Sequence, residues 1–114
     1  MSQAERIQQS ETRMFKAVFP NTTNHYDTLF SGTALQLMDE VAFITATRYS
    51  RQRMVTISSD ETSFTQPISA DTIIELVGTV IYMGNTSLKE QEKAISGRFT
   101  LVAIDEDKKP IRIQ

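Results

Sequence analysis

Residues 33–49 constrain the fold of this chain more than any other segment. Wound as a helix, they place apolar residues around most of the circumference: Ala34, Leu35, Leu37, Met38, Val41, Ala42, Phe43, Ile44 and Ala46. A helix that is apolar nearly all round is buried on more than one side. Thr33 and Gln36 have the spacing of a capping box, which predicts that the helix begins at Thr33. The chain is therefore expected to wrap its other elements around one central helix.

Most of the remaining chain has the composition of β-strands. Alternating or β-branched residues predict strands over residues 13–19, 54–59, 72–83 and 94–105. The first of these is stopped by Pro20, and Gly78 inside the third indicates a bulge or a point of close approach. One strand, a buried helix and then several strands predict an α+β fold, in which an antiparallel sheet clasps the helix.

Length and composition bound the possible functions. The 114 residues fit a single domain, 1–114, in which residues 1–11 form a polar leader or a short surface helix. A net charge of −2 argues against nucleic acid as a partner. No residue is a cysteine and His25 is the one histidine, so thiolate chemistry, disulfides and multi-histidine metal sites are excluded. No signal peptide or membrane-inserting segment is recognisable, so we expect a cytoplasmic protein.

Two polar residues lie on either side of the predicted start of the helix. Asn24 belongs to a loop rich in turn residues, and Asp39 lies within the apolar helix. A carboxylate among apolar neighbours costs several kcal/mol unless it is paired or used in chemistry. The free backbone N–H groups near Gly32 could stabilise an anion at the positive end of the helix dipole. His25 is a weaker candidate for a base, because a single loop histidine is more often a surface residue.

Three segments carry a resemblance to a known family. They are Pro20 to Asp39, then Val55-Thr56 with Phe64 and Pro67, and Gly84-Asn85-Thr86-Ser87. In order and spacing they resemble the hotdog-fold acyl-CoA thioesterases, in particular the subgroup with the brain-type cytosolic acyl-CoA hydrolase and its bacterial relatives. The resemblance extends over residues 15–111.

This resemblance implies a hotdog fold, a curved antiparallel sheet wrapped around one long central helix. It also implies self-association as a dimer or a trimer of dimers, with Asn24 of one subunit facing Asp39 of another across the catalytic site. The residues expected to hold the thioester oxygen or the rest of the substrate are Ser31, Gly32, Thr86 and Ser87. Acyl-CoA would be the substrate, so coenzyme A belongs to substrate and product, and no metal or other cofactor is implied.

The chain departs from the family pattern at three places. Ser31 stands where the family usually has the first of two glycines, and Asp27 stands where it usually has another. Glycine reaches backbone angles that Ser and Asp mostly avoid. Between Ser87 and Ala94 the chain is too short for the strand and turn of the relatives. A lost strand would leave unpaired sheet edges, so we expect instead that residues are missing from the sequence there.

The sequence thus predicts an acyl-CoA thioester hydrolase that releases free CoA and a fatty acid, with Asp39 as base or nucleophile. Two alternatives stay open. A hotdog acyl dehydratase would use His25 with Asp39 and would form an enoyl product without free thiol. A non-catalytic acyl-CoA sensor would bind its ligand tightly without turnover.

Overall fold

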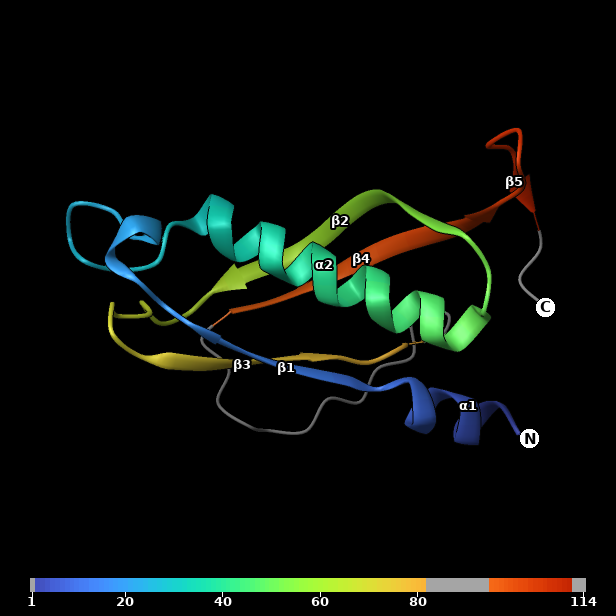
Figure 1. The fold of residues 1–114 in the computed structure, drawn as a ribbon, viewed down its shortest axis with the longest axis horizontal. Helices are drawn as coiled ribbons and strands as arrows, with labels where there is room; N and C mark the ends of the chain where they lie inside the picture. Colours follow the sequence, from blue (N-terminus) through green and yellow to red (C-terminus); the bar gives the residue numbers. More distant parts are fainter. Residues whose placement is uncertain (1, 82–94, 112–114) are drawn as a thin grey trace.

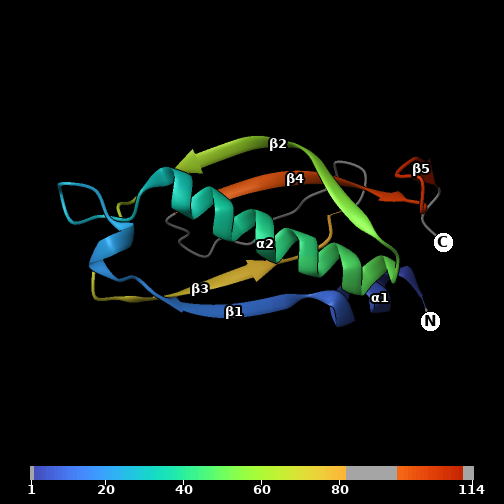
Figure 2. The same ribbon diagram turned by 45° about the horizontal axis from the view of Figure 1, so that its top comes forward.

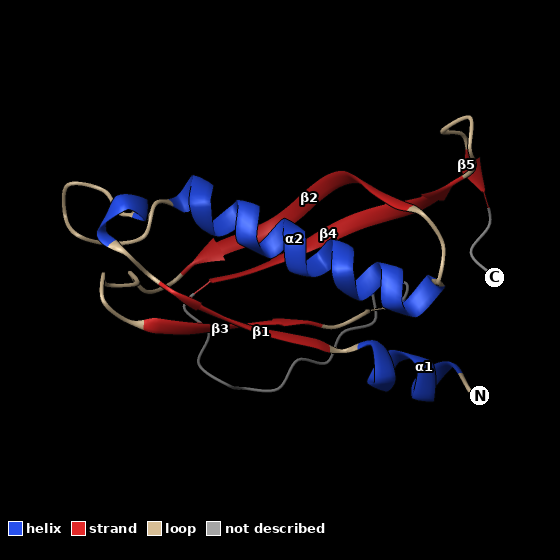
Figure 3. Cartoon of the chain, viewed as in Figure 1, coloured by secondary structure: helices blue, strands red, loops and turns tan. Residues whose placement is uncertain are grey.

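A computed structural model describes residues 2–81 and 95–111, apart from the side chains of residues 60 and 61. In it one long helix, α2 (Ser31–Ser50), lies across antiparallel strands (Figure 1). The other elements are α1 (Gln3–Ser10), β1 (Thr12–Ala17), a 3-10 helix (Pro20–Thr22), β2 (Met54–Phe64), β3 (Ile73–Gly78), β4 (Ile95–Ile104) and β5 (Pro110–Ile111). In the view of Figure 3, α2 has β2 and β4 along one edge and β1 and β3 along the other, and this combination of helix and antiparallel strands is the predicted α+β class.

The strands pair in two groups. β1 pairs antiparallel with β3, from Thr12 opposite Gly78 to Ala17 opposite Ile73. The second group has the order β2-β4-β5, and β2 begins with Met54 opposite Ala103. The register of β2 shifts between Thr56 and Ser58, so Ile57 is the extra residue of a β-bulge. Bulges of this kind bend a strand and redirect its side chains.

The core lies between α2 and the strands. Its buried apolar residues are Val18, Ala34, Val41, Tyr49, Met54, Ala103 and Ile104. Among the described residues, α2 buries one face only. Gln36, Glu40 and Phe43 on the opposite face are exposed, and Phe43 is 45% exposed. The expectation of burial on more than one side is therefore not met within a single copy of the chain, because the described strands cover the helix from one side.

Gly78 confirms one of the two roles predicted for it. A Cβ added at this glycine would lie 2.8 Å from Cγ1 of Val41 and in collision with Oγ1 of Thr45. The Thr45 hydroxyl is itself held by α2, where it donates to the Val41 carbonyl at 2.7 Å. Gly78 is thus a point of close approach between β3 and α2, because an added side chain would collide with the helix there.

The predicted helix start is wrong. α2 begins at Ser31 with Phe30 as its N-cap, and no side chain caps it, so Thr33 and Gln36 do not form a capping box. Phe30 is fixed instead through its backbone, whose N–H donates to the Thr22 carbonyl at 3.1 Å. A capping box does occur in α1, where the Ser2 hydroxyl accepts from Glu5 N–H and the Glu5 carboxylate accepts in return from Ser2 N–H.

The strand boundaries differ from expectation in three places. β1 stops at Ala17 rather than residue 19, and β2 continues beyond residue 59 to Phe64. β3 ends at Gly78, and the rest of its predicted range lies partly outside the described residues. The segment expected to lack a strand, from Ser87 to Ala94, also lies outside them.

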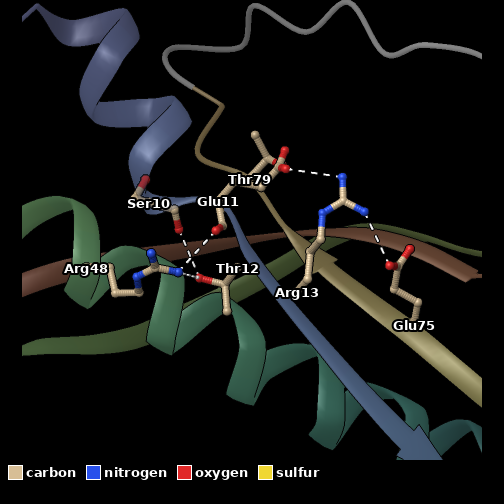
Figure 4. Close-up of polar contacts among 7 residues, drawn as sticks. All are labelled: Ser10, Glu11, Thr12, Arg13, Arg48, Glu75 and Thr79. Atoms are coloured by element: carbon tan, nitrogen blue, oxygen red, sulfur yellow. Dashed lines mark hydrogen bonds and ion pairs between the residues drawn. The ribbon is translucent and has the colours of Figure 1, made fainter.

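Helix α1 is fastened to the C-terminal end of α2, which makes residues 3–10 a surface helix rather than a loose leader. The Arg48 guanidinium donates to Thr12 Oγ1 at 3.0 Å and to the Glu11 carbonyl at 3.1 Å (Figure 4). It also donates to the Gln9 carbonyl at 2.8 Å. Arg6 donates to the Tyr49 carbonyl at 2.7 Å and lies 4.4 Å from the centre of the Tyr49 ring. Among the described residues, no helix is long and apolar enough to cross a membrane.

Candidate active site

Asn24 lies in the loop that precedes α2, and its side chain is bound by that loop. Asn24 Oδ1 accepts from Tyr26 N–H at 2.9 Å, from Thr28 N–H at 3.2 Å and from the Thr28 hydroxyl at 3.1 Å. Because both backbone N–H groups are donors, the Asn24 atom that they contact must be the amide oxygen and not the amide nitrogen. With the oxygen committed to the loop, the amide nitrogen is the group that can donate to a ligand.

The loop itself is anchored to the segment before β3. Leu29 N–H donates to the Ile68 carbonyl at 2.8 Å, and Ala70 N–H donates to the Asp27 carbonyl at 2.9 Å. Asp27 has a φ of 62°, the left-handed region in which the family pattern usually places glycine. Aspartate tolerates this conformation better than most residues. The loop therefore keeps its turn without the glycine, and it projects beyond the N-terminal end of α2 (Figure 2).

Asp39 lies on α2, two turns from its start, and is half-buried. Its Oδ1 accepts a hydrogen bond from the Thr56 hydroxyl at 2.7 Å. Thr56 belongs to β2 and directly precedes the bulge residue Ile57. This bond leaves the second carboxylate oxygen to act on a ligand. Asp39 is therefore paired with a hydroxyl, and the apolar surroundings expected for it are only partial.

Asp39 opens into a groove between the N-terminal half of α2 and β2. The groove has a volume of about 510 Å³. Its lining consists of Gly32, Leu35, Gln36, Asp39, Thr56, Ile57, Ser58, Ser59 and Phe99. No atom lies within 4 Å of a Cβ built on Gly32, so the space above the first turn of α2 is open. The first helix bond there runs from Ala34 N–H to the Phe30 carbonyl at 2.9 Å, and the N–H groups ahead of it are the ones a helix leaves unpaired.

The structure brings together some of the predicted site residues. Gly32 and Asp39 share the groove, and Ser31 adjoins Gly32 at the start of α2. Asn24 is not among the residues that line this groove. His25 is exposed on the same loop as Asn24, with its ring centre 3.9 Å from that of Tyr26. Thr86 and Ser87 lie outside the described residues.

Thr56 is a candidate that sequence reasoning did not select. Val55-Thr56 was part of the family pattern, but nothing in the local sequence indicated a contact with Asp39. The two residues are brought together only when β2 packs along α2. The one signal for Thr56 in the sequence is its place in the Val55-Thr56 segment of the family pattern.

Comparison with known proteins identifies the class. A long helix packed against antiparallel strands is the fold that this chain shares with solved hotdog-fold hydrolases. One is the Staphylococcus aureus acyl-CoA hydrolase in complex with butyryl coenzyme A, coenzyme A and coenzyme A disulfide, 31% identical, with a TM-score of 0.81 over 91% of this chain and 71% of that one. Another is an apo-hexameric acyl-CoA thioesterase, 30% identical, with a TM-score of 0.83 over 94% of this chain and 77% of that one.

Sequence comparison gives the family. The profile of the thioesterase superfamily matches residues 26–90. An uncharacterized acyl-CoA thioester hydrolase of Zymomonas mobilis is 33% identical over 82% of this chain and 72% of its own length. An uncharacterized acyl-CoA thioester hydrolase of Bacillus subtilis is 32% identical over 84% of this chain and 63% of its own length. The rat cytosolic acyl coenzyme A thioester hydrolase is 25% identical over 94% of this chain and 32% of its own length. The chain belongs to the thioesterase superfamily, among the relatives of the acyl-CoA thioester hydrolases, as the sequence predicted.

The Staphylococcus aureus hydrolase has also been solved with alanine in place of one asparagine, one aspartate or one threonine, at 29% identity to this chain. In that protein the aspartate follows the asparagine by 15 positions, and the threonine follows the aspartate by 17. Asn24, Asp39 and Thr56 have the same spacing here.

Proposed function

We propose that this chain hydrolyses acyl-CoA thioesters to free CoA and a fatty acid, with Asp39 and Asn24 from opposite subunits as the acting residues. The observation that carries the proposal is the Asp39 carboxylate, held by Thr56 at 2.7 Å in an open groove beside the first turn of a helix. The names of the relatives support the substrate class.

Asp39 acts as the general base in this proposal. Thr56 occupies Oδ1, so Oδ2 takes a proton from a water molecule in the groove while the water oxygen attacks the thioester carbonyl carbon. The tetrahedral intermediate then collapses, the carbon–sulfur bond breaks, and the CoA sulfur leaves with the proton that Asp39 had taken. The fatty acid is the second product. A nucleophilic role would use the same oxygen, and the experiment below does not depend on which role applies.

Two kinds of donor are available for the oxyanion. The unpaired N–H groups at the first turn of α2 point toward the positive end of the helix dipole, and the open space at Gly32 admits an oxygen. The Asn24 amide nitrogen is the second donor, because Asn24 Oδ1 is already bound within its loop. Losing one such donor typically costs about a hundredfold in rate or more.

Asn24 and the groove belong to different copies in this proposal. Asn24 does not line the groove that contains Asp39. A single copy would therefore supply Asp39 to one site and Asn24 to another. The exposed face of α2, with Phe43 45% exposed, supports burial against a second copy. A structural relative is hexameric, which supports a dimer or a trimer of dimers. We place the enzyme in the cytoplasm, like its mammalian relatives named as cytosolic.

The test compares the wild type with Asp39→Asn in an assay of thiol release from acetyl-, butyryl-, octanoyl- and palmitoyl-CoA. Asparagine keeps the size of Asp39 and still accepts from Thr56, but it removes the base, so we expect kcat to fall about a hundredfold or more. The variant must keep the melting temperature and oligomeric state of the wild type. Unchanged thiol release would exclude Asp39 from the reaction.

No observation favours the two alternatives. His25 lies beside Tyr26 on the exposed loop rather than in the groove with Asp39, so it offers no dehydratase pair within a copy. The groove keeps an acidic side chain, which a simple sensor does not need. Formation of an enoyl product without free thiol would support the dehydratase instead. Tight binding of acyl-CoA without turnover would support the sensor.

A further inference from the structure

The bulge in β2 places an additional side chain beside the proposed reaction centre. A regular strand sends successive side chains to opposite faces, so only every second one can face a neighbouring helix. Here the register shift makes Ile57 the extra residue, and the four consecutive residues from Thr56 to Ser59 all line the groove. Bulges next to active sites commonly redirect a side chain in this way.

Ile57 is the most exposed of the large apolar residues that line the groove. It is 59% exposed although it lies in the middle of β2. The other large apolar side chains in the lining, Leu35 and Phe99, are half-buried. Exposure of this apolar side chain to water is unfavourable, and a bound apolar group that covered it would gain free energy from the burial.

The position of Ile57 relates it directly to the reacting carbonyl. It is the next residue after Thr56, whose hydroxyl binds Asp39 at 2.7 Å. Leu35 lies one helical turn before Asp39 on the same face of α2, and Ile57 belongs to β2 in the same lining. A thioester that reacts at Asp39 in this groove would therefore lie along a lining that contains both Ile57 and Leu35.

We propose that Ile57 is a specificity-determining residue, whose side chain packs against the first carbons of the acyl chain and favours longer chains over acetyl. The inference rests on the proposed function, because it assumes that the thioester reacts at Asp39. An acyl chain offers only methylene groups near its carbonyl, and these match isoleucine. The pantetheine arm of CoA carries amides, which need hydrogen-bonding partners such as the hydroxyls of Ser58 and Ser59 in the same lining.

The test measures kcat/KM of Ile57→Ala for acetyl-, butyryl-, octanoyl- and palmitoyl-CoA. We expect the ratio of the best long chain to acetyl-CoA to fall about tenfold, since contacts of one or a few methylenes discriminate by that order. Val55→Ala is the matched control. Val55 lies on the same strand and is 38% exposed, but it does not line the groove, so its profile should parallel that of the wild type.

Three results would overturn the inference. An equal fall for every chain length, with weaker inhibition by free CoA, would place Ile57 against CoA instead. An unchanged profile with a smaller oligomer would assign Ile57 to a subunit contact. A wild type that releases no thiol would overturn the proposed function as well, whereas the first two results leave that function intact. Ile57→Val gives the same test with a smaller change if the alanine variant does not fold.

Discussion

At the scale of single residues, hydrogen bonds within the chain decide which side-chain atoms of the proposed site can still bind a ligand. Asn24 binds its own loop through Oδ1, and Asp39 binds Thr56 through Oδ1. Each residue is thus left with one atom for a ligand, a donor nitrogen in the first case and an acceptor oxygen in the second. In the proposed reaction these two atoms have complementary roles, because the Asp39 oxygen would take a proton from water and the Asn24 nitrogen would stabilise the oxyanion.

Thr56→Val removes the hydroxyl that orients Asp39 while keeping a β-branched side chain of similar shape. A hydrogen bond to a charged group is worth about 1.5–3 kcal/mol, so we expect kcat to fall by roughly tenfold or more. KM should change less than kcat, because the Thr56 hydroxyl is engaged by Asp39 although the residue also lines the groove. The measurement is steady-state kinetics of thiol release, together with thermal unfolding.

Thr56→Ser is the control for this prediction. Serine restores the hydroxyl, so it should recover most of the wild-type kcat if orientation of Asp39 is the role of Thr56. A serine variant as impaired as the valine variant would show that the methyl group, and hence packing, is what matters at this position.

The sequence suggested Asn24 and Asp39 as candidates but not Thr56. Asn24 and Asp39 stand out because a turn and a helix start lie between them, and both features are local. The contact of Thr56 with Asp39 joins a strand to a helix across 17 positions of the chain. It depends on how β2 packs along α2, and no local pattern encodes that packing. The left-handed conformation of Asp27 could not be predicted from the residue type either, because aspartate adopts right-handed or extended backbone conformations more often.

At the scale of elements, one close contact constrains how α2 packs on β3. β3 approaches the helix at Gly78, where an added Cβ would lie 2.8 Å from Cγ1 of Val41. We expect Gly78→Ala to destabilise the protein by about 1–3 kcal/mol, because overpacking forces the strand or the helix to shift. Chemical denaturation followed by circular dichroism measures this loss.

Gly97→Ala is a comparison for that prediction. Its added Cβ would lie 3.2 Å from the terminal methyl of Met38, a flexible side chain that can move, and 3.2 Å from Oγ1 of Thr62. Neither contact is as close as the two closest at Gly78. Gly97→Ala should therefore cost less than Gly78→Ala. Equal costs would mean that loss of a glycine from a strand, and not the approach to α2, determines the effect.

The elements were predictable in type but not at their ends. The apolar helix and the strands follow from periodicity, which is a property of each segment by itself. The start of α2 was misplaced because Phe30 is held by a backbone bond to Thr22, which a search for capping side chains does not detect. The extension of β2 to Phe64 depends on its pairing with β4, which is far away in the sequence.

At the scale of the whole molecule, the chain shows an incomplete burial of its central helix. Among the described residues, one face of α2 packs on the strands, and the opposite face carries the exposed residues Gln36, Glu40 and Phe43. The sequence predicted burial on more than one side because its apolar pattern does not separate contacts within a copy from contacts between copies. A second copy against this face would account for both observations.

A shared site makes a quantitative prediction about mixed oligomers. Asn24→Asp keeps the acceptor oxygen that its loop needs but removes the donor nitrogen, and Asp39→Asn removes the base. Each variant alone should lose thiol release. In a dimer with one copy of each, one site combines both defects, and the other combines intact Asn24 with intact Asp39. Random pairing of equal amounts should therefore restore about one quarter of the wild-type activity, if sites act independently.

The measurement requires co-expression of the two variants with different affinity tags and purification through both tags in succession. Before tag selection the co-expressed mixture should show the one quarter, and doubly tagged dimers, which exclude both inactive homodimers, should show about one half. A mixture of the separately purified variants should show no recovery until subunits exchange. A site built within one copy gives a different result, because every copy then carries a defect and no pairing repairs it. Absence of recovery in doubly tagged oligomers that are folded and of wild-type size would thus place Asn24 and Asp39 in the same copy or remove one of them from the reaction.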